Sequence, residues 1–181
     1  MTLARSLVPS QTLMTRALMV LGGSAFIALS AQVSVPMLPV PMTLQTLAVM
    51  LVGFAYGARL GALTVLAYLA EGLAGLPVFA NLGNGAALMG PTAGFLLGFV
   101  PMAYLTGLAA DRGLSRVLPL TLVAIGVSAA LYVPGLAVLS GFVGGFDKAL
   151  AIGVQFMPGD VVKSVIAALV LSGAWATIAR R

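Results

Sequence analysis

Long apolar runs, separated by short polar or Gly- and Pro-rich interruptions, dominate this chain of 181 residues. A helix that crosses a lipid bilayer uses about 20 consecutive apolar residues. With short connections each crossing takes about 30 residues of chain, so the length accommodates five or six crossings. The apolar runs predict six helices, over about residues 17–33, 42–56, 60–70, 93–109, 117–139 and 158–178.

Three interruptions are too rich in turn-forming residues to be long helices. Prolines 36, 39 and 41 favour extended backbone between the first two helices. Segment 71–92 is the longest candidate loop, because Gly, Pro and Asn recur throughout it. A Gly-rich connection over residues 140–147 leads through a candidate short helix to Pro158, where the sequence predicts that the last long helix begins.

Composition places the chain in a membrane. Hydrophobic residues make up 61% and charged residues 7%, against roughly 25% charged in an average soluble domain. The 22 glycines and 10 prolines suit tight turns, close helix contacts and broken segments. The predicted fold class is an all-α integral membrane protein that forms a single transmembrane domain over residues 1–181.

The absence of His and Cys excludes most catalytic chemistry. The chain lacks the groups for an imidazole triad, a thiolate nucleophile, a Cys or His zinc site and a disulfide. Its glycines match neither a Walker loop nor a dinucleotide-binding turn, so nothing in the sequence indicates ATP hydrolysis. We expect no catalytic residue, no metal site and no resident cofactor.

Membrane topology, rather than nucleic acid, explains the formal charge of +5. The basic residues are scattered singly and form no patch that tracks a phosphate backbone. A cytoplasmic N-terminus leaves only Lys148 outside and places the following residues inside: Arg5, Arg16, Arg59, Arg112, Arg116, Arg180 and Arg181. This asymmetry requires an even number of spans, puts both termini in the cytoplasm and makes segment 71–92 an outer loop.

Two ionisable residues, Asp160 and Lys163, interrupt the last apolar run. A charged side chain at the centre of a membrane helix costs roughly 2.5–3.5 kcal/mol on insertion scales, so such residues are rare and commonly functional. The two lie one turn apart on one helical face. They form either a ligand-binding pair or an acid in the first helical turn, favoured by the helix dipole, whose pairing with Lys163 stabilises the helix.

Other polar side chains lie at the predicted outer face. Thr43, Gln45 and Thr46 begin the second helix, where they either bind a ligand or form hydrogen bonds between helices. Asn81 and Asn84 in the Gly-rich loop either recognise a ligand or cap turns. For Asn84, which precedes a glycine, the turn is favoured.

Aromatic and small residues leave further alternatives open. Phe79, Tyr68 and Tyr104 either wall an apolar pocket or lie in the aromatic belt at the membrane surface. Small residues at four-residue spacing, such as Gly94 with Gly98 and Ser24 with Ala28, indicate close helix packing within the chain or against a partner.

Four motifs follow one another along the chain: Val40–Leu47 (VPMTLQTL), Gly72–Ala80 (GLAGLPVFA), Leu88–Phe95 (LMGPTAGF), and Met157–Asp160 (MPGD) with Lys163. Together they resemble the BioY family of biotin-specific S components of energy-coupling factor (ECF) transporters. The resemblance covers nearly the whole chain and implies a six-helix protein of the bacterial or archaeal cytoplasmic membrane. Such a protein captures biotin from outside and works with a transmembrane coupling subunit, the T component, and ABC-type ATPase subunits.

The resemblance also implies a biotin site. Biotin offers a ureido ring with two N–H donors and one carbonyl, an apolar thioether ring and a carboxylate. Asp160 would accept from the ureido nitrogens, Lys163 or Asn81 would donate to the carbonyl, and Phe79 would cover the thioether ring. The candidate ligand-binding residues are Asp160, Lys163, Asn81, Gln45, Thr43, Phe79, Asn84 and Tyr104. Ser24 and Ala28 are candidates for partner docking, because they stand where S components carry an Ala-xxx-Ala pattern.

Two other functions compete with this interpretation. A self-sufficient proton-coupled secondary transporter of a small organic solute would use Asp160 as its proton site and Lys163 as the counter-charge. A membrane-embedded hydrolase is disfavoured, because it needs a Ser-Lys or carboxylate arrangement and the chain has only four acids.

Overall fold

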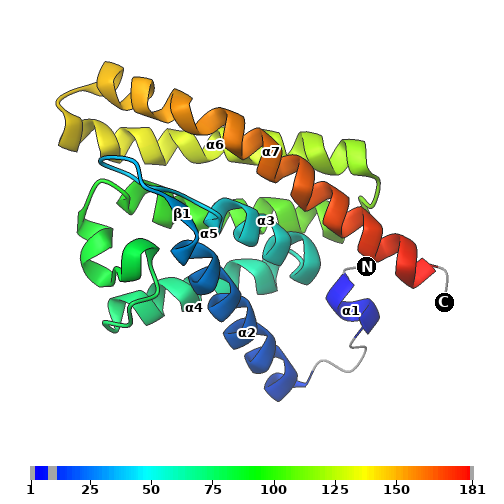
Figure 1. Ribbon diagram of the computed structural model, residues 1–181. Helices are drawn as coiled ribbons and strands as arrows, with labels where there is room; N and C mark the ends of the chain where they lie inside the picture. The colour runs from blue at the N-terminus through cyan, green and yellow to red at the C-terminus, as the bar shows by residue number, and fades with distance from the viewer. Residues whose placement is uncertain (1–2, 8–11, 180–181) are drawn as a thin grey trace.

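The computed structural model describes residues 3–7 and 12–179, most of which are helical (Figure 1). The α-helices are α1 (Leu3–Leu7), α2 (Leu13–Gln32), α3 (Gln45–Tyr56), α4 (Ala58–Leu73), α5 (Ala93–Asp111), α6 (Val117–Val143) and α7 (Phe146–Ala179). Two 3-10 helices, η1 (Ala80–Leu82) and η2 (Gly85–Met89), lie between α4 and α5. The predicted all-α class is confirmed, and helices α2 to α7 correspond to the six apolar runs.

The proline-rich segment between α2 and α3 is not helical, as predicted. It forms a small antiparallel ribbon of β1 (Ser34–Val35) and β2 (Met42–Thr43), in which Ser34 pairs with Thr43. Because the ribbon continues through Thr43, α3 begins at Gln45, later than the sequence indicates. Thr43 therefore projects from the ribbon and Gln45 from the first turn of α3.

The prediction that the last helix begins at Pro158 is wrong. Helix α7 runs without a break from Phe146 to Ala179, with Pro158 inside it. Proline has no N–H and leaves one carbonyl of the preceding turn without its helical hydrogen bond, but membrane helices tolerate this where neighbouring helices pack closely. Helix α6 lies along α7 and supplies that packing (Figure 1). Asp160 consequently lies well inside a helix and not in its first turn.

Helix α5 joins the two halves of the bundle. It packs against α3 and α4 on one side and against α6 on the other. A side chain at Gly94 would collide with the backbone of Pro134 on α6, so the close packing predicted at this glycine is confirmed. The resulting contact brings the start of α5 and the middle of α6 together beside the ribbon.

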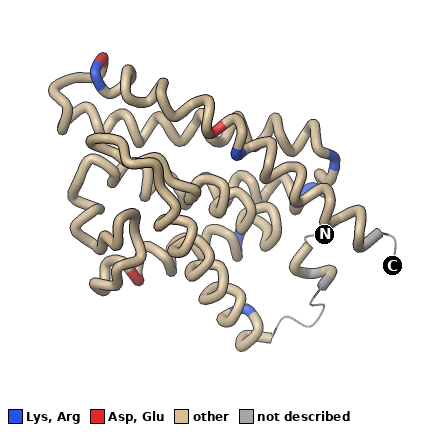
Figure 2. The backbone as a smooth tube through the Cα atoms, in the orientation of Figure 1, with Lys and Arg blue, Asp and Glu red and all other residues tan. Residues whose placement is uncertain are grey.

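Four of the described helices, α2, α5, α6 and α7, are long and apolar enough to cross a membrane. Helices α3 and α4 have 12 and 16 residues, and at about 1.5 Å per residue both are shorter than a hydrocarbon core of about 30 Å. The α5–α6 turn, which carries Arg112 and Arg116, lies at the same end of the molecule as the end of α7 (Figure 2). Arg180 and Arg181, predicted to be cytoplasmic, lie outside the described residues.

Candidate ligand-binding site

A cavity lies among α3, α5, α6 and α7, with the β1–β2 ribbon beside it. Each of these elements contributes side chains, although they are far apart in the sequence. The lining residues are Val40, Pro41, Met42, Thr43, Gln45, Thr46, Ala80, Thr92, Phe95, Leu96, Phe99, Leu131, Tyr132, Phe156, Asp160 and Lys163. Four of the predicted ligand-binding residues are therefore brought together: Thr43, Gln45, Asp160 and Lys163.

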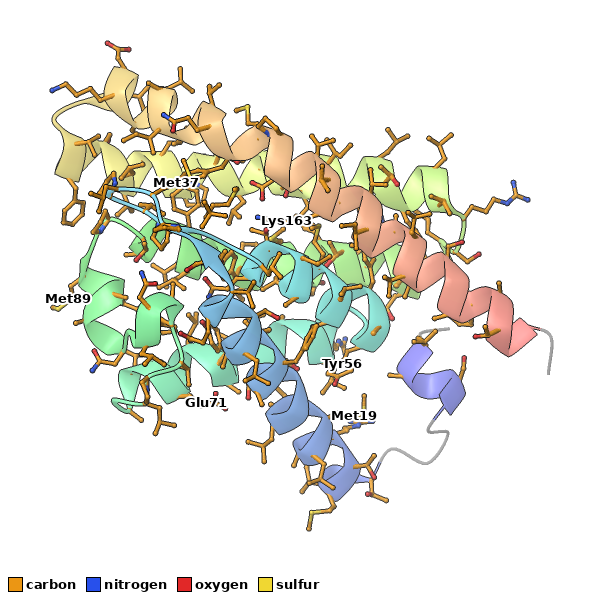
Figure 3. All side chains as sticks on the ribbon, in the orientation of Figure 1. Met19, Met37, Tyr56, Glu71, Met89 and Lys163 are labelled. Carbon is orange, nitrogen blue, oxygen red and sulfur yellow. The ribbon has the colours of Figure 1, made fainter. Side chains whose placement is uncertain are left out.

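Asp160 is the centre of the polar part of the cavity. Its Oδ1 accepts from Lys163 Nζ at 3.1 Å and from Thr46 Oγ1 at 3.2 Å, and its Oδ2 accepts from Tyr132 Oη at 2.6 Å. Asp160 and Lys163 are each only 7% exposed. Figure 3 shows Lys163 between α7 and α3. One carboxylate thus ties α7 to both α3 and α6.

The position of Asp160 removes one explanation of the charged pair. An acid in the first turn would be stabilised by the helix dipole, but that effect falls off within a turn and Asp160 lies deep inside α7. The ion pair with Lys163 at i, i+3 is present. A buried pair of this kind does not stabilise a fold more than apolar residues of the same size would. Helix stabilisation alone therefore does not account for the two charges.

The rest of the cavity wall is mostly apolar and includes three phenylalanine rings. Phe95 and Phe99 come from α5 and Phe156 from α7. The ring of Phe95 meets the edge of Tyr132 with a centroid distance of 6.1 Å and an interplanar angle of 88°. This contact orients Tyr132, which also bonds to Asp160. Within the described residues, no group of three His, Cys, Asp or Glu side chains is arranged to hold a metal ion.

A second set of hydrogen bonds runs from the cavity to the loop after α4. Thr43 Oγ1 donates to Gln45 Oε1 at 3.0 Å, and Gln45 Nε2 donates to Tyr68 Oη at 2.6 Å. Tyr68 Oη in turn donates to the carbonyl oxygen of Val78 at 3.0 Å. Tyr68 is completely buried, so it does not belong to a surface aromatic belt. The cavity and the loop after α4 are therefore connected through the protein interior.

The other predicted ligand-binding residues do not line the cavity. Phe79 is buried behind it, where its ring packs against Gly72 and edge-on against Tyr68 with centroids 5.2 Å apart. Asn81 is exposed, and Asn84 accepts from the N–H of Ala86 as the N-cap of η2. Tyr104 on α5 is 44% exposed. The turn-capping alternative for Asn84 is thus the one that its geometry satisfies.

The structure also turns the candidate docking residue Ser24 inward. Ser24 is 1% exposed, and its Oγ donates to Glu71 Oε1 at 2.6 Å. Glu71 lies near the end of α4, beside α2 (Figure 3). Ala28 is half-buried against the core. The Ser24-xxx-Ala28 pattern therefore packs within the chain, and Ser24 does not offer its side chain to a partner.

Tyr132 is a cavity residue that sequence reasoning missed. It is the one hydroxyl-bearing aromatic, two residues before Pro134, in a helix of 27 residues that carries no charged side chain. A buried tyrosine hydroxyl usually finds a hydrogen-bond partner. That rule marks Tyr132 as a polar residue of interest, but its partner on α7 is visible only once the helices are packed.

Apolar helices around a cavity with a buried charged pair define a multi-pass membrane protein with a candidate binding site between its helices. Its fold matches a crystal structure of the S-component for biotin from an ECF-type ABC transporter, with a TM-score of 0.78 over 90% of this chain and 93% of that chain and with 23% sequence identity. The profile of the BioY family matches residues 4–180. The chain belongs to the BioY family.

Curated relatives support this assignment from both bacteria and archaea. The biotin transporter BioY of Thermotoga maritima is 40% identical over 149 residues, which cover 81% of this chain and 88% of the relative. The biotin transporter BioY of Rhizobium etli is 41% identical over 147 residues, covering 76% and 79%. The probable biotin transporter BioY of Pyrococcus horikoshii is 38% identical over 148 residues, covering 81% and 87%. These relatives are transporters, and the family predicted from the four motifs is confirmed.

Proposed function

We propose that this protein is the biotin-binding S component of an ECF-type transporter. It captures biotin from the outer side of the cytoplasmic membrane and performs no covalent chemistry. A transmembrane coupling subunit and ABC-type ATPase subunits supply the energy for uptake, and the chain itself holds no cofactor. The biotin transporters among its relatives and the likeness to an S-component for biotin support the ligand and the type of transporter.

The single observation that carries this proposal is the buried ammonium group of Lys163 at the cavity. An ammonium group has three N–H donors, and within the described part of the chain Lys163 Nζ donates to one acceptor, Asp160. A buried cation with unused donors is costly unless a ligand provides acceptors. Biotin has two such groups, the ureido carbonyl and the carboxylate.

The remaining features of the cavity suit the other parts of biotin. A carboxylate has about four acceptor positions, of which Asp160 uses three for Lys163, Thr46 and Tyr132. The free position accepts from a ureido N–H. Phe95, Phe99 and Phe156 cover the thioether ring, a role that was expected of Phe79 from the sequence. Gln45 and Thr43 complete the polar side of the site.

The same proposal includes six membrane crossings with both termini in the cytoplasm. Helix α3 is too short to cross alone, but the ribbon before it extends the crossing, and irregular backbone is tolerated in a membrane where it lines a cavity. Val40, Pro41, Met42 and Thr43 of this segment do line the cavity. Arg16, Arg59, Arg112 and Arg116 then fall on the cytoplasmic side and Lys148 outside.

Cysteine labelling tests this topology, because the chain has no cysteine of its own. Ala86→Cys in η2 and Ser115→Cys in the α5–α6 turn are both at exposed positions. A membrane-impermeant maleimide should label Ala86→Cys in intact cells and Ser115→Cys only after permeabilisation. The reverse pattern, or labelling of both in intact cells, contradicts the proposed orientation.

Calorimetric titration of the detergent-purified chain with biotin tests the ligand. We expect tight binding at one site, weaker binding of desthiobiotin, which lacks the thioether ring, and no binding of thiamine, which lacks the ureido group. Folded protein that does not bind biotin would contradict the assignment. Uptake that continues in ATP-depleted but energised cells would instead favour the proton-coupled secondary transporter.

A further inference from the structure

We infer that Gln32, at the end of α2, is a positioning residue that holds the loop Phe79–Gly83 against the biotin site and slows release of the bound ligand. This inference rests on the proposed function. It concerns a residue outside the cavity lining and outside the four family-like motifs.

The side chain of Gln32 bridges the loop through two hydrogen bonds. Its Nε2 donates to the carbonyl oxygen of Phe79 at 3.0 Å, and its Oε1 accepts from the N–H of Leu82 at 3.0 Å. The side-chain amide of Gln32 thus donates to one backbone group and accepts from another, both in the same short turn. The turn itself is closed by the N–H of Phe79, which donates to the carbonyl oxygen of Gly83 at 2.8 Å.

The loop needs such support because its backbone is strained. Asn81 and Leu82 have φ values of 56° and 57°, in the left-handed region that side chains other than glycine disfavour. Asparagine tolerates this region better than most residues, because its short polar side chain can form local hydrogen bonds. The apolar side chain of leucine cannot. Backbone in such a conformation persists only where surrounding contacts hold it. The bond from Leu82 N–H to Gln32 is a contact of this kind.

The clamped loop touches the ligand site in two ways. Ala80, between the two residues that Gln32 bridges, lines the cavity directly. Phe79 packs against Tyr68, and Tyr68 accepts from Gln45, a second lining residue. Movement of the loop therefore alters the wall at Ala80 and the hydrogen bonds of Gln45 together.

Helix α2 is well placed to control this loop. It is the least buried of the four long apolar helices among the described residues. A further polar link joins Ser24 of α2 to Glu71 in the last turn of α4, the helix that precedes the loop. Gln32 is itself exposed. A substitution there removes the two loop contacts and leaves the core intact.

The experiment measures how fast radiolabelled biotin leaves the detergent-purified chain after unlabelled biotin is added. Gln32→Met keeps the length of the side chain and removes both hydrogen bonds to the loop, together with the bond from Nε2 to the Ala28 carbonyl in its own helix. We expect release about tenfold faster, the size for two neutral hydrogen bonds, with an association rate close to wild type. Gln155→Met is the matched control, because Gln155 is also an exposed helical glutamine but bonds only to its own helix, at Ala151. Its release rate should equal that of wild type.

A second variant tests the loop without touching α2. Leu82→Asn places a residue that accepts left-handed backbone at an exposed position. It should slow release severalfold in the wild-type background and restore part of the retention lost in Gln32→Met, which a merely structural role for Gln32 would not produce.

The outcomes separate the inference from the proposed function. Wild-type protein that binds no biotin overturns the proposed function. Wild-type binding with unchanged release from Gln32→Met, or equal acceleration in Gln155→Met, overturns the role of Gln32 and leaves the function standing. Unchanged release from Leu82→Asn in both backgrounds also overturns that role.

Discussion

Two carboxylates, Asp160 and Asp111, link neighbouring helices in different ways. Asp111, the last residue of α5, accepts from the backbone N–H of Ala58 at 2.9 Å, at the first residue of α4. Helix α5 can come this close because residue 107 is a glycine. Any side chain at Gly107 would collide with the backbone of residues 57 and 58. Asp160 instead accepts from three side chains on three helices.

The difference is the one that we expect between an acid with a structural role and an acid of the proposed ligand site. The partner of Asp111 is a backbone amide at a helix N-terminus, which has no acceptor within its own helix and favours negative charge. Asp111 is exposed to solvent, although Ala58 is buried, and the junction is complete without a ligand. At Asp160 the paired cation is buried, lines a cavity and has donors to spare. We therefore base the proposed ligand site on the unused hydrogen-bond donors of a buried charge, and not on hydrogen bonding alone.

The largest expected effect comes from removing either charge of the buried pair. Asp160→Asn and Lys163→Ala should each weaken biotin binding at least about tenfold, because each removes a contact with the ligand and leaves the other charge buried without its partner. Calorimetric titration measures the loss, and both variants should still insert into the membrane. Affinity close to wild type in both variants would return the pair to a helix-stabilising role.

A smaller effect is expected at Tyr132, which supports Asp160 from α6. Tyr132→Phe keeps the ring contact with Phe95 and removes the hydroxyl that donates to Asp160 at 2.6 Å. Binding of biotin should weaken by about fivefold, less than the full value of a hydrogen bond to a charged group, because Tyr132 acts on the ligand only through Asp160. Unchanged affinity in Tyr132→Phe would mean that the hydroxyl of Tyr132 does not support the site through Asp160.

The smallest effect on binding is expected at the structural acid. Asp111→Asn is the same substitution as Asp160→Asn, but it should leave biotin affinity within about twofold and lower the free energy of unfolding by at most about 1 kcal/mol, the size of a helix-dipole interaction. Thermal unfolding of the purified variant in detergent checks the stability. A large loss of biotin affinity in Asp111→Asn would contradict the proposal that only Asp160 belongs to the ligand site.

Much of the candidate site could be predicted from the sequence, because charged residues are rare within apolar membrane helices and are therefore easy to recognise. Asp160 and Lys163 stand out in an apolar run, and Gln45 and Thr43 follow a proline-rich segment that could not be helical. Pro158 misled the prediction, because the rule that proline begins a helix weakens where neighbouring helices support the backbone. The same error placed Asp160 in a first turn that does not exist.

Residues of the loop between α4 and α5 were harder to place. Phe79, Asn81 and Asn84 share a loop next to the site, yet Phe79 packs behind the cavity and Asn84 caps η2. In a loop without a regular period, sequence spacing does not determine which side chains face inward. Tyr68 was equally open between belt and pocket, and it is neither: it is the buried link between Gln45 and Val78.

The sequence by itself determined the membrane class, the six apolar helices, the extended segment before α3 and the charged pair on α7. These are local properties, since hydropathy, proline content and one-turn spacing are read from neighbouring residues. Only the tertiary structure decided which groups meet. Tyr132 and Thr46 reach Asp160 from 28 and 114 residues away, and Gln32 reaches the loop from 47. Such contacts depend on how each helix is rotated and how closely it packs, which spacing along one chain does not encode.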